Sequence, residues 1–190
     1  MQYSDLKRFI KIPEIKAERI ILRAISRNDL DDVFEYASDE AVSRYLLWSP
    51  HETKAVTKRY LSIVESKYKQ ALFYDWGVVY NGKMIGTCGF SSISVENNSA
   101  ELGFVLNRSY WGLGIAREAA MSVIRYGFRE LALNRIESRY MIENEQSASV
   151  MKKCGMSFEG IHRESLLVKG KYRDIGYYAI TRKDYFDRVI

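Results

Sequence analysis

The sequence contains few of the residues that build disulfide frameworks and metal sites. Its two cysteines, Cys88 and Cys154, lie in no CxxC or other ligand spacing. We therefore expect no disulfide framework and interpret both as small buried hydrophobic residues. The two histidines, His51 and His162, have no partner at a metal-ligand spacing. The sequence thus predicts no metal site.

Long apolar runs are also missing. No segment reaches the roughly 18 consecutive apolar residues of a membrane span, and the charged N-terminus lacks the apolar core of a secretory signal. We therefore expect a cytoplasmic protein without a membrane partner. With only two prolines, no internal repeat and no linker, residues 1–190 predict a single domain. A monomer and a homodimer both remain open.

Positive charge is in excess but is not concentrated. The formal net charge is +5, and lysine and arginine are spread along the whole chain without a basic tract or arm. A nucleic-acid partner is therefore not expected. The same balance suits an anionic small molecule.

The pattern of apolar residues and turns predicts a mixed α/β domain. Strands are expected over residues 19–25, 73–80, 84–95, 100–106, 135–142, 158–168 and 173–182. Helices are expected over residues 26–38, 51–71, 112–131 and 147–154, and the segment 39–47 is compatible with another short one. Asn81-Gly82 is the strongest hairpin signal. The order β-α-α-β-β-β-α-β-α-β-β indicates a mixed sheet with helices on its faces.

A glycine turn joins the strand that ends near Leu106 to the helix that follows. Its core is Trp111-Gly112-Leu113-Gly114. Two glycines let the backbone approach a ligand closely and point consecutive N–H groups outward, and the helix N-terminus adds partial positive charge. This arrangement suits a pyrophosphate. Arg117 stands where a dinucleotide fingerprint needs Gly or Ala, and no P-loop is present. An ordinary strand-to-helix turn is the alternative interpretation.

The longer stretch around this turn resembles a family motif. Residues 110–119, YWGLGIAREA, are similar to motif A of the GNAT superfamily of N-acetyltransferases, although Ser109 stands at its Arg/Gln position. The form YWG-x-G-x-A-x-EA resembles the ribosomal-protein-alanine N-acetyltransferase (RimJ/RimL-type) branch. Within residues 144–155, Asn-x-x-Ser and Lys-x-Gly match a second family block in register. The resemblance spans about residues 17–185, which we take as the core of the domain.

This resemblance implies a fold, a donor and a set of contacts. The fold is a mostly antiparallel, splayed sheet flanked by helices, and the donor is acetyl-CoA. The pantetheine arm is assigned to the backbone of Phe104, Val105 and Leu106. The pyrophosphate is assigned to Gly112, Leu113, Gly114, Ile115, Ala116 and Arg117, and Trp111 is also counted among the donor-binding residues. Gly103 is expected to permit a β-bulge, and Asn144 is either a pantetheine ligand or a helix N-cap.

Amine acetylation requires two proton transfers, and the resemblance offers one candidate for each. Glu101 heads the motif strand, where it is either a base acting through water or a solvated strand-end carboxylate. Ser147 matches a hydroxyl that lies close to the sulfur in relatives. It either protonates the leaving thiolate or caps a helix.

The acceptor is the least determined element. The branch resemblance favours the N-terminal α-amine of a protein, such as a ribosomal protein. A small amine (polyamine, amino acid derivative or antibiotic) is an alternative, and so is a non-catalytic acetyl-CoA-binding module. Tyr45, Trp48, Phe73, Tyr74 and Trp76 either line an acceptor pocket or belong to the core. Lys152 and Lys153 either meet the outer phosphate of the donor or face water.

Overall fold

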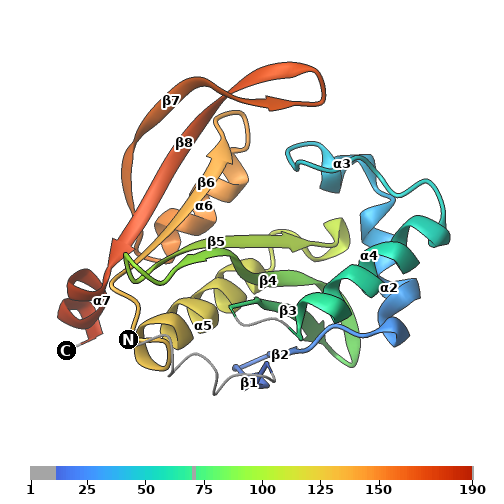
Figure 1. The fold of residues 1–190 in the computed structure, drawn as a ribbon, viewed down its shortest axis with the longest axis horizontal. Coiled ribbons are helices and arrows are strands. Elements are labelled where there is room, and N and C mark those ends of the chain that lie inside the picture. Colours follow the sequence, from blue (N-terminus) through green and yellow to red (C-terminus); the bar gives the residue numbers. More distant parts are fainter. Residues whose placement is uncertain (1–11, 70–71, 190) are drawn as a thin grey trace.

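A computed structural model describes residues 12–69 and 72–189 of the chain. These residues form an eight-stranded sheet in the order β1-β2-β3-β4-β5-β6-β8-β7 (Figure 1). The strands are β1 (Ile15–Lys16), β2 (Ile20–Arg23), β3 (Tyr74–Tyr80), β4 (Lys83–Ser94), β5 (Ser99–Leu106), β6 (Arg135–Met141), β7 (Ser157–Val168) and β8 (Lys171–Thr181). Neighbouring strands are antiparallel except for the parallel pair β5–β6. The predicted mixed, mostly antiparallel sheet is confirmed.

Helices cover both faces of this sheet. The helices are α2 (Leu30–Ala37), α3 (Glu40–Ser43), α4 (Lys54–Lys67), α5 (Ile115–Arg129), α6 (Glu145–Lys153) and α7 (Arg182–Val189), with 3-10 turns η1 (Arg27–Asp29) and η2 (Arg108–Tyr110). One core joins α5 and α6 to the strands through residues such as Trp76, Phe90 and Ile124. A second core, on the opposite face, holds α2 and α4 through Val33, Leu61 and their neighbours.

Element boundaries differ from the predictions at several places. The predicted first helix begins at Ser26 as the 3-10 turn η1, because the Ser26 side chain accepts from the Asn28 amide and pairs with Asp29 in a capping box. The helix predicted over 51–71 begins only at Lys54, and residues 70–71 lie outside the described part. Strand β1 was not predicted. The expectation that the N-terminus is not a secretory signal concerns residues 1–11 as well, and these residues lie outside the described part.

Helix α7 was missed as well. Its sequence, RKDYFDRV, is short and charged, so no apolar stripe marks it. Its start does carry a signal. The Asp184 amide donates to Thr181 Oγ1 over 3.2 Å, and the Thr181 amide donates to Asp184 Oδ2 over 3.0 Å. This Thr-x-x-Asp arrangement satisfies two N-terminal donors, as a capping box does.

The two central strands diverge, and this positions the site. β5 pairs with β6 only from Ser99↔Arg135 to Glu101↔Glu137, whereas it stays paired with β4 as far as Gly86↔Leu106. Where the strands part, the buried Ser138 hydroxyl donates to the Leu102 carbonyl over 2.8 Å. The rest of β5 therefore presents a backbone edge that none of the described strands covers.

The bulge lies elsewhere than predicted. Gly103 pairs regularly with Gly89, and a Cβ built on Gly103 meets nothing within 4 Å. The irregularity instead falls in β4, between Phe90 and Ser92. Its extra residue, Ser91, faces the point where β5 leaves β6. The prediction of a bulge at Gly103 is therefore wrong, although the divergence that it was meant to explain is present.

Both cysteines are buried and unpaired, as predicted. Burial raises the pKa of the Cys88 thiol, and burial raises the pKa of the Cys154 thiol to about 12 despite the opposing charge of Arg117. Among residues 12–69 and 72–189, no helix is long and apolar enough to cross a membrane. In those same residues no group of three or more His, Cys, Asp or Glu side chains is placed to hold a metal ion.

Candidate active site

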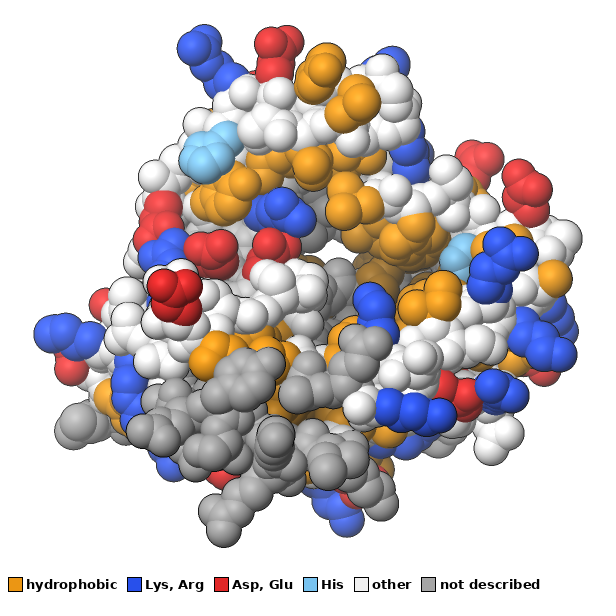
Figure 2. All heavy atoms as spheres, in the orientation of Figure 1, with side chains coloured by type: hydrophobic (Ala, Val, Ile, Leu, Met, Phe, Trp, Pro, Cys, Tyr) orange, Lys and Arg blue, Asp and Glu red, His pale blue; other side chains and the backbone are white. Residues whose placement is uncertain are grey.

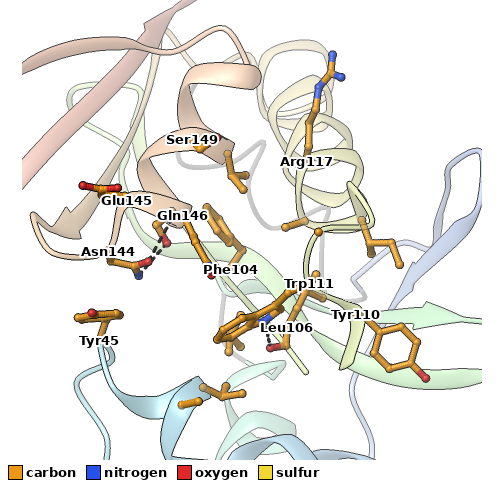
Figure 3. Close-up of a pocket in the computed structure, with 18 of the residues that line it drawn as sticks. Tyr45, Phe104, Leu106, Tyr110, Trp111, Arg117, Asn144, Glu145, Gln146 and Ser149 are labelled. Atoms are coloured by element: carbon orange, nitrogen blue, oxygen red, sulfur yellow. Dashed lines mark hydrogen bonds between the residues drawn. The ribbon is translucent and has the colours of Figure 1, made fainter. Parts of the chain in front are cut away.

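A cavity of about 770 Å³ opens beside the uncovered edge of β5. It is bordered by the end of β5, the glycine turn, the first turn of α5, helix α6, and α3 with the segment after it (Figure 3). Phe104, Val105 and Leu106 all line it, so the predicted strand and the predicted turn are brought together. Leu113 is absent from its lining.

The glycine turn is built to present backbone donors. Gly112 has φ +76° and Gly114 has φ +77°, and Gly114 is the N-cap of α5. Both φ values lie in the left-handed region that L side chains disfavour. The amide N–H groups of residues 112–117 have no acceptor among the described residues, because the first turn of a helix lacks intrahelical partners. The turn therefore offers a convergent set of donors at a positive helix end.

Two further contacts fix this turn. The Trp111 indole Nε1 donates to the Leu106 carbonyl over 2.9 Å, which ties the turn to the end of β5 (Figure 3). Arg19 donates through its Nη1 to the Leu113 carbonyl over 3.0 Å, while its Nε and its backbone amide donate to Glu118, each over 2.7 Å. Sequence reasoning missed Arg19, since its partners lie about a hundred residues away. The one sign of this contact in the sequence was its partner Glu118, which lies inside the motif that resembles the family.

Two carbonyls along the uncovered edge of β5 are already engaged. Ser138 engages the Leu102 carbonyl and Trp111 engages the Leu106 carbonyl, both on the side away from β4. Backbone groups point to alternate sides along a strand. The N–H and C=O of Phe104 therefore face the same uncovered side, between these two bonds.

Asn144 and Ser147 sit at the start of α6. Asn144 is the N-cap, its Oδ1 accepting from the Ser147 amide over 3.3 Å, and its Nδ2 donates to Ser147 Oγ over 3.1 Å. The capping alternative for Asn144 is thus present in the structure. The Ser147 hydroxyl accepts from Asn144 and keeps its own proton available to donate.

A second cavity, of about 200 Å³, lies on the other side of Asn144 and Ser147. Glu101 lines it, and Glu101 Oε1 lies 3.0 Å from Arg139 Nε. These two are the charged side chains among the lining residues, and they pair with each other. The residues that border both cavities are Tyr45, Leu46, Phe104, Asn144 and Ser147. The two cavities therefore meet at Phe104 and Ser147.

Some candidates lie away from the site. Tyr74 and Trp76 are core residues of the α5 face, and Trp48 and Phe73 pack in the α2–α4 core. Tyr45 alone of the predicted aromatic set borders the cavities. Lys153 lines the larger cavity, whereas Lys152 does not. The Arg117 side chain points away from the cavity (Figure 3), although its residue borders it.

Two cavities that meet at one strand edge, one of them with a cradle for an anion, are an arrangement that suits a transferase. The family model for the acetyltransferase (GNAT) domain matches residues 19–157. The chain belongs to this GNAT family and is an N-acetyltransferase.

Individual relatives of the chain are also named as N-acetyltransferases. The chain is 33% identical over 170 residues to the uncharacterized N-acetyltransferase p20 of Bacillus licheniformis, covering 88% of this chain and 96% of that one. It is 24% identical to the [ribosomal protein uS5]-alanine N-acetyltransferase of Escherichia coli (92% and 94% covered) and 25% identical to the spermidine N(1)-acetyltransferase of the same species (89% and 89%).

Solved structures share the fold. A GNAT-family acetyltransferase from Bacillus anthracis superposes with a TM-score of 0.80 at 31% identity, covering 90% of this chain and 99% of that one. RimL, a ribosomal L7/L12 α-N-protein acetyltransferase in complex with coenzyme A, gives a TM-score of 0.80 at 19% identity, covering 89% and 98%. The family uses acetyl-CoA as its acetyl donor.

Proposed function

We propose that this enzyme transfers acetyl from acetyl-CoA to the N-terminal α-amine of a protein or peptide, by direct attack while both substrates are bound. The single observation that carries this is the meeting of the two cavities at Phe104 and Ser147. One cavity has donors for a pyrophosphate, and the other has a carboxylate for an amine. A thioester held along β5 would place its carbonyl where an amine from the smaller cavity can reach it.

The larger cavity fits the donor. Coenzyme A carries a pyrophosphate and an extended amide chain. The free amides of residues 112–117 suit the pyrophosphate, and the uncovered edge of β5 suits the amide chain. When bound, acetyl-CoA supplies an activated acetyl group. The Phe104 N–H lies at the uncovered edge and is assigned to the thioester oxygen, a contact worth about 2.7–4 kcal/mol if it acts like other oxyanion donors.

The proton transfers are assigned to Glu101 and Ser147. Glu101 accepts the proton that the ammonium loses before attack, through water, with Arg139 holding its carboxylate in place. The amine nitrogen then bonds to the acetyl carbon as the carbon–sulfur bond breaks. Ser147 Oγ donates its proton to the departing sulfur and takes up, through water, the second proton that the nitrogen loses on becoming an amide, while Asn144 Nδ2 donates to that oxygen.

The acceptor class follows from charge. A polyamine carries several positive charges, but the smaller cavity contains one carboxylate that is already paired with Arg139. That balance suits a single amine better than a polycation. An α-amine has a pKa of about 7.7–8.0 against about 10.4 for lysine, so more of it is the free nucleophile near neutral pH. The likeness to the ribosomal-protein acetyltransferase supports the same acceptor.

Donor binding is tested by calorimetry with acetyl-CoA. Gly112→Asp places a carboxylate in the cradle and should abolish measurable binding. Gly82→Asp is a matched control, because Gly82 has a similar φ of +80° and both positions have open space around an added Cβ. The control should bind as the wild type does. No binding to the wild-type protein would overturn the proposal.

The acceptor is tested by mass spectrometry after incubation with acetyl-CoA. A short peptide with a free N-terminal Ala or Ser should be acetylated on that amine. The same peptide with a blocked N-terminus and an internal lysine, and spermidine, should react far more slowly. Exclusive labelling of lysine or spermidine would exclude the α-amine while leaving the transferase assignment intact.

A further inference from the structure

Gly103 lies inside β5, where neither the backbone nor the described packing requires a glycine. It has no positive φ, and it pairs regularly with Gly89 on β4. A Cβ built on it meets no described atom within 4 Å. Each of the other glycines either has a positive φ or would bring an added Cβ within 3.1 Å of a neighbouring atom. Gly103 is therefore the glycine that conformation and packing leave unexplained.

The absence of a side chain at this position has a cost. A glycine in a strand interior weakens the fold relative to alanine, because it loses more backbone freedom on folding. An alanine would fit the space at Gly103 and would avoid that loss. A strand glycine without a bulge or a close backbone neighbour is typical of a place that a ligand approaches.

The neighbouring strand does not fill the space at Gly103. Residues directly opposite each other on paired strands share a face of the sheet, and the residue opposite Gly103 is Gly89. Gly89 is a glycine for a different reason, since a Cβ there would lie 2.2 Å from the Tyr74 carbonyl oxygen of β3. Two side chains are thus missing at the same place, and packing explains only one of them.

This bare patch lies in the smaller cavity, between two groups that the proposed reaction has to connect. Glu101, Gly103 and Phe104 all line that cavity. Side chains two residues apart on a strand point to the same face, so the Glu101 side chain lies on the face where Gly103 has none. The space-filling view shows the molecule hollowed near its centre, with hydrophobic side chains around the hollow (Figure 2).

The separation of those groups calls for a relay. The thioester oxygen is assigned to the Phe104 N–H, and Glu101 lies three residues earlier, which is about 10 Å along a strand. The Glu101 carboxylate is held on the β6 side, because its Oε1 lies 3.0 Å from Arg139 Nε. A hydrogen bond spans only about 3 Å. A water between the attacking amine and Glu101 would lie over residue 103, where a methyl group would displace it.

We propose that Gly103 is a positioning residue, whose missing side chain keeps open the place of the water that carries a proton from the acceptor ammonium to Glu101. The ammonium gives a proton to this water, the water gives one of its own protons to a carboxylate oxygen of Glu101, and the amine is left neutral for attack. The inference rests on the proposed function, which assigns the base, and it adds the residue that makes room for the relay.

The acceptor amine dominates the pH dependence of this step. Around Glu101 the titratable groups are those of Glu137, opposite it in the register, and of the lining residues Tyr45, Arg139 and Tyr140. Burial raises the pKa of Tyr140 above its ordinary value. Carboxylates, tyrosines and arginines ordinarily titrate outside the range from pH 6.5 to pH 9, whereas an α-amine titrates within it, at about 7.7–8.0.

The first test is the pH dependence of Gly103→Ala. No described atom opposes the added methyl group, so the melting temperature should rise by about 1–4 °C. The Kd for acetyl-CoA should not change. At pH 6.5 most of an α-amine is protonated, and kcat/KM should fall by about 10–10²-fold as the general base loses its relay. At pH 9 the amine is largely free, so the variant should come within about threefold of the wild type.

The second test is a double-mutant cycle with Glu101→Gln. If the space at Gly103 serves Glu101, Gly103→Ala should change kcat/KM at pH 6.5 by less than about twofold once residue 101 is glutamine. The cycle can be measured with whichever amine the wild type accepts. An equal loss in both backgrounds would show that the methyl group only obstructs the acceptor, and it would overturn the role of Gly103. Wild-type kcat/KM in Gly103→Ala at pH 6.5 would overturn it as well.

The same measurements separate this inference from the proposed function. If Glu101→Gln alone keeps the wild-type rate, Glu101 is not the base and both assignments fail. If Glu101→Gln is slow and Gly103→Ala causes the same loss in both backgrounds, the base assignment stands and only the relay over Gly103 is excluded.

Discussion

The two cavities of this enzyme are built in different ways. The larger one lies where the edge of β5, the glycine turn and the first turns of α5 and α6 present backbone donors. The smaller one is lined by residues from separate segments, namely the segment after α3, β5, β6, α6 and the β7–β8 hairpin. Backbone donors suit a donor molecule that every family member shares. Side chains from separate segments can vary independently, which suits an acceptor that differs between relatives.

The largest effect is expected at Glu101, which borders only the smaller cavity. Glu101→Gln removes the carboxylate that accepts the ammonium proton, so kcat/KM should fall by about 10²–10⁴-fold. The affinity for acetyl-CoA should not change. Initial rates between about pH 6 and pH 9, together with calorimetry, measure both.

Glu137→Gln is the control for this change. Glu137 lies opposite Glu101 in the β5–β6 register and is also paired with an arginine, Arg135, but it borders neither cavity. Its rate should stay close to that of the wild type. If the Glu101→Gln enzyme keeps wild-type turnover over the whole pH range, the role of Glu101 is structural and not catalytic.

Ser147 borders both cavities and should affect the chemical step alone. Ser147→Ala removes the proton donor, and kcat should fall about 10²-fold. The helix cap survives, because Asn144 Oδ1 accepts from the Ser147 backbone amide. The melting temperature should therefore stay within about 2 °C of the wild type. A large loss of melting temperature with little loss of kcat would identify Ser147 as a capping residue.

Arg19 should affect only the larger cavity. Arg19→Met releases the Leu113 carbonyl and removes the positive charge beside Glu118, whose carboxylate keeps only the backbone amide of residue 19, near the pyrophosphate cradle. Both changes oppose anion binding, so the Kd for acetyl-CoA should rise about tenfold. Arg27→Met, which breaks a comparable Arg–Glu pair with Glu65, should leave that Kd unchanged. If the KM for the acceptor rises by the same factor as the Kd for the donor, the two cavities are coupled, and Arg19 does not act on the larger cavity alone.

The smallest effect concerns the frame that supports both cavities. Asp75 lies on β3 and borders neither cavity, and burial raises the pKa of its carboxyl to about 7 although the charge of Lys67 opposes this. The folded protein therefore holds this proton more tightly than the unfolded chain does. The stability that the protonated form contributes is complete below about pH 4 and is lost as the pH rises through about 7.

Asp75→Asn cannot lose that proton. The difference in melting temperature, variant minus wild type, should therefore increase between about pH 5 and pH 8. Thermal unfolding at several pH values measures it, and the affinities for both substrates should be unaffected. A difference that does not change with pH would show that Asp75 has an ordinary pKa in the folded protein.

The sequence predicted the larger cavity far better than the smaller one. The glycine turn, the end of β5 and Asn144 lie in contiguous motifs, and the geometry of a turn or a helix start is decided by local residues. The smaller cavity depends on Tyr45, Leu166 and Ile175, which come together only through the sheet order β6-β8-β7. The periodicity of a single segment carries no information about which distant residues line the same cavity.

Single side chains that join distant segments were missed for the same reason. Arg19 binds Glu118, Ser138 binds the Leu102 carbonyl, and Lys169 binds the Ser43 carbonyl. In each pair one partner is an ordinary polar residue on a strand or in a turn. For the aromatic set the sequence left pocket and core open, and most of its members belong to the core.

The burial of both cysteines makes the enzyme convenient to assay. Acetyl transfer releases one free thiol per turnover, which a chromogenic disulfide such as the Ellman reagent can report continuously. Protein thiols normally add background, since the reagent reacts with any accessible thiolate. Cys88 and Cys154 are buried and hold their protons tightly, so the native enzyme should contribute almost no colour. A rise in the absorbance of a blank without acceptor would then indicate that the enzyme unfolds during the measurement.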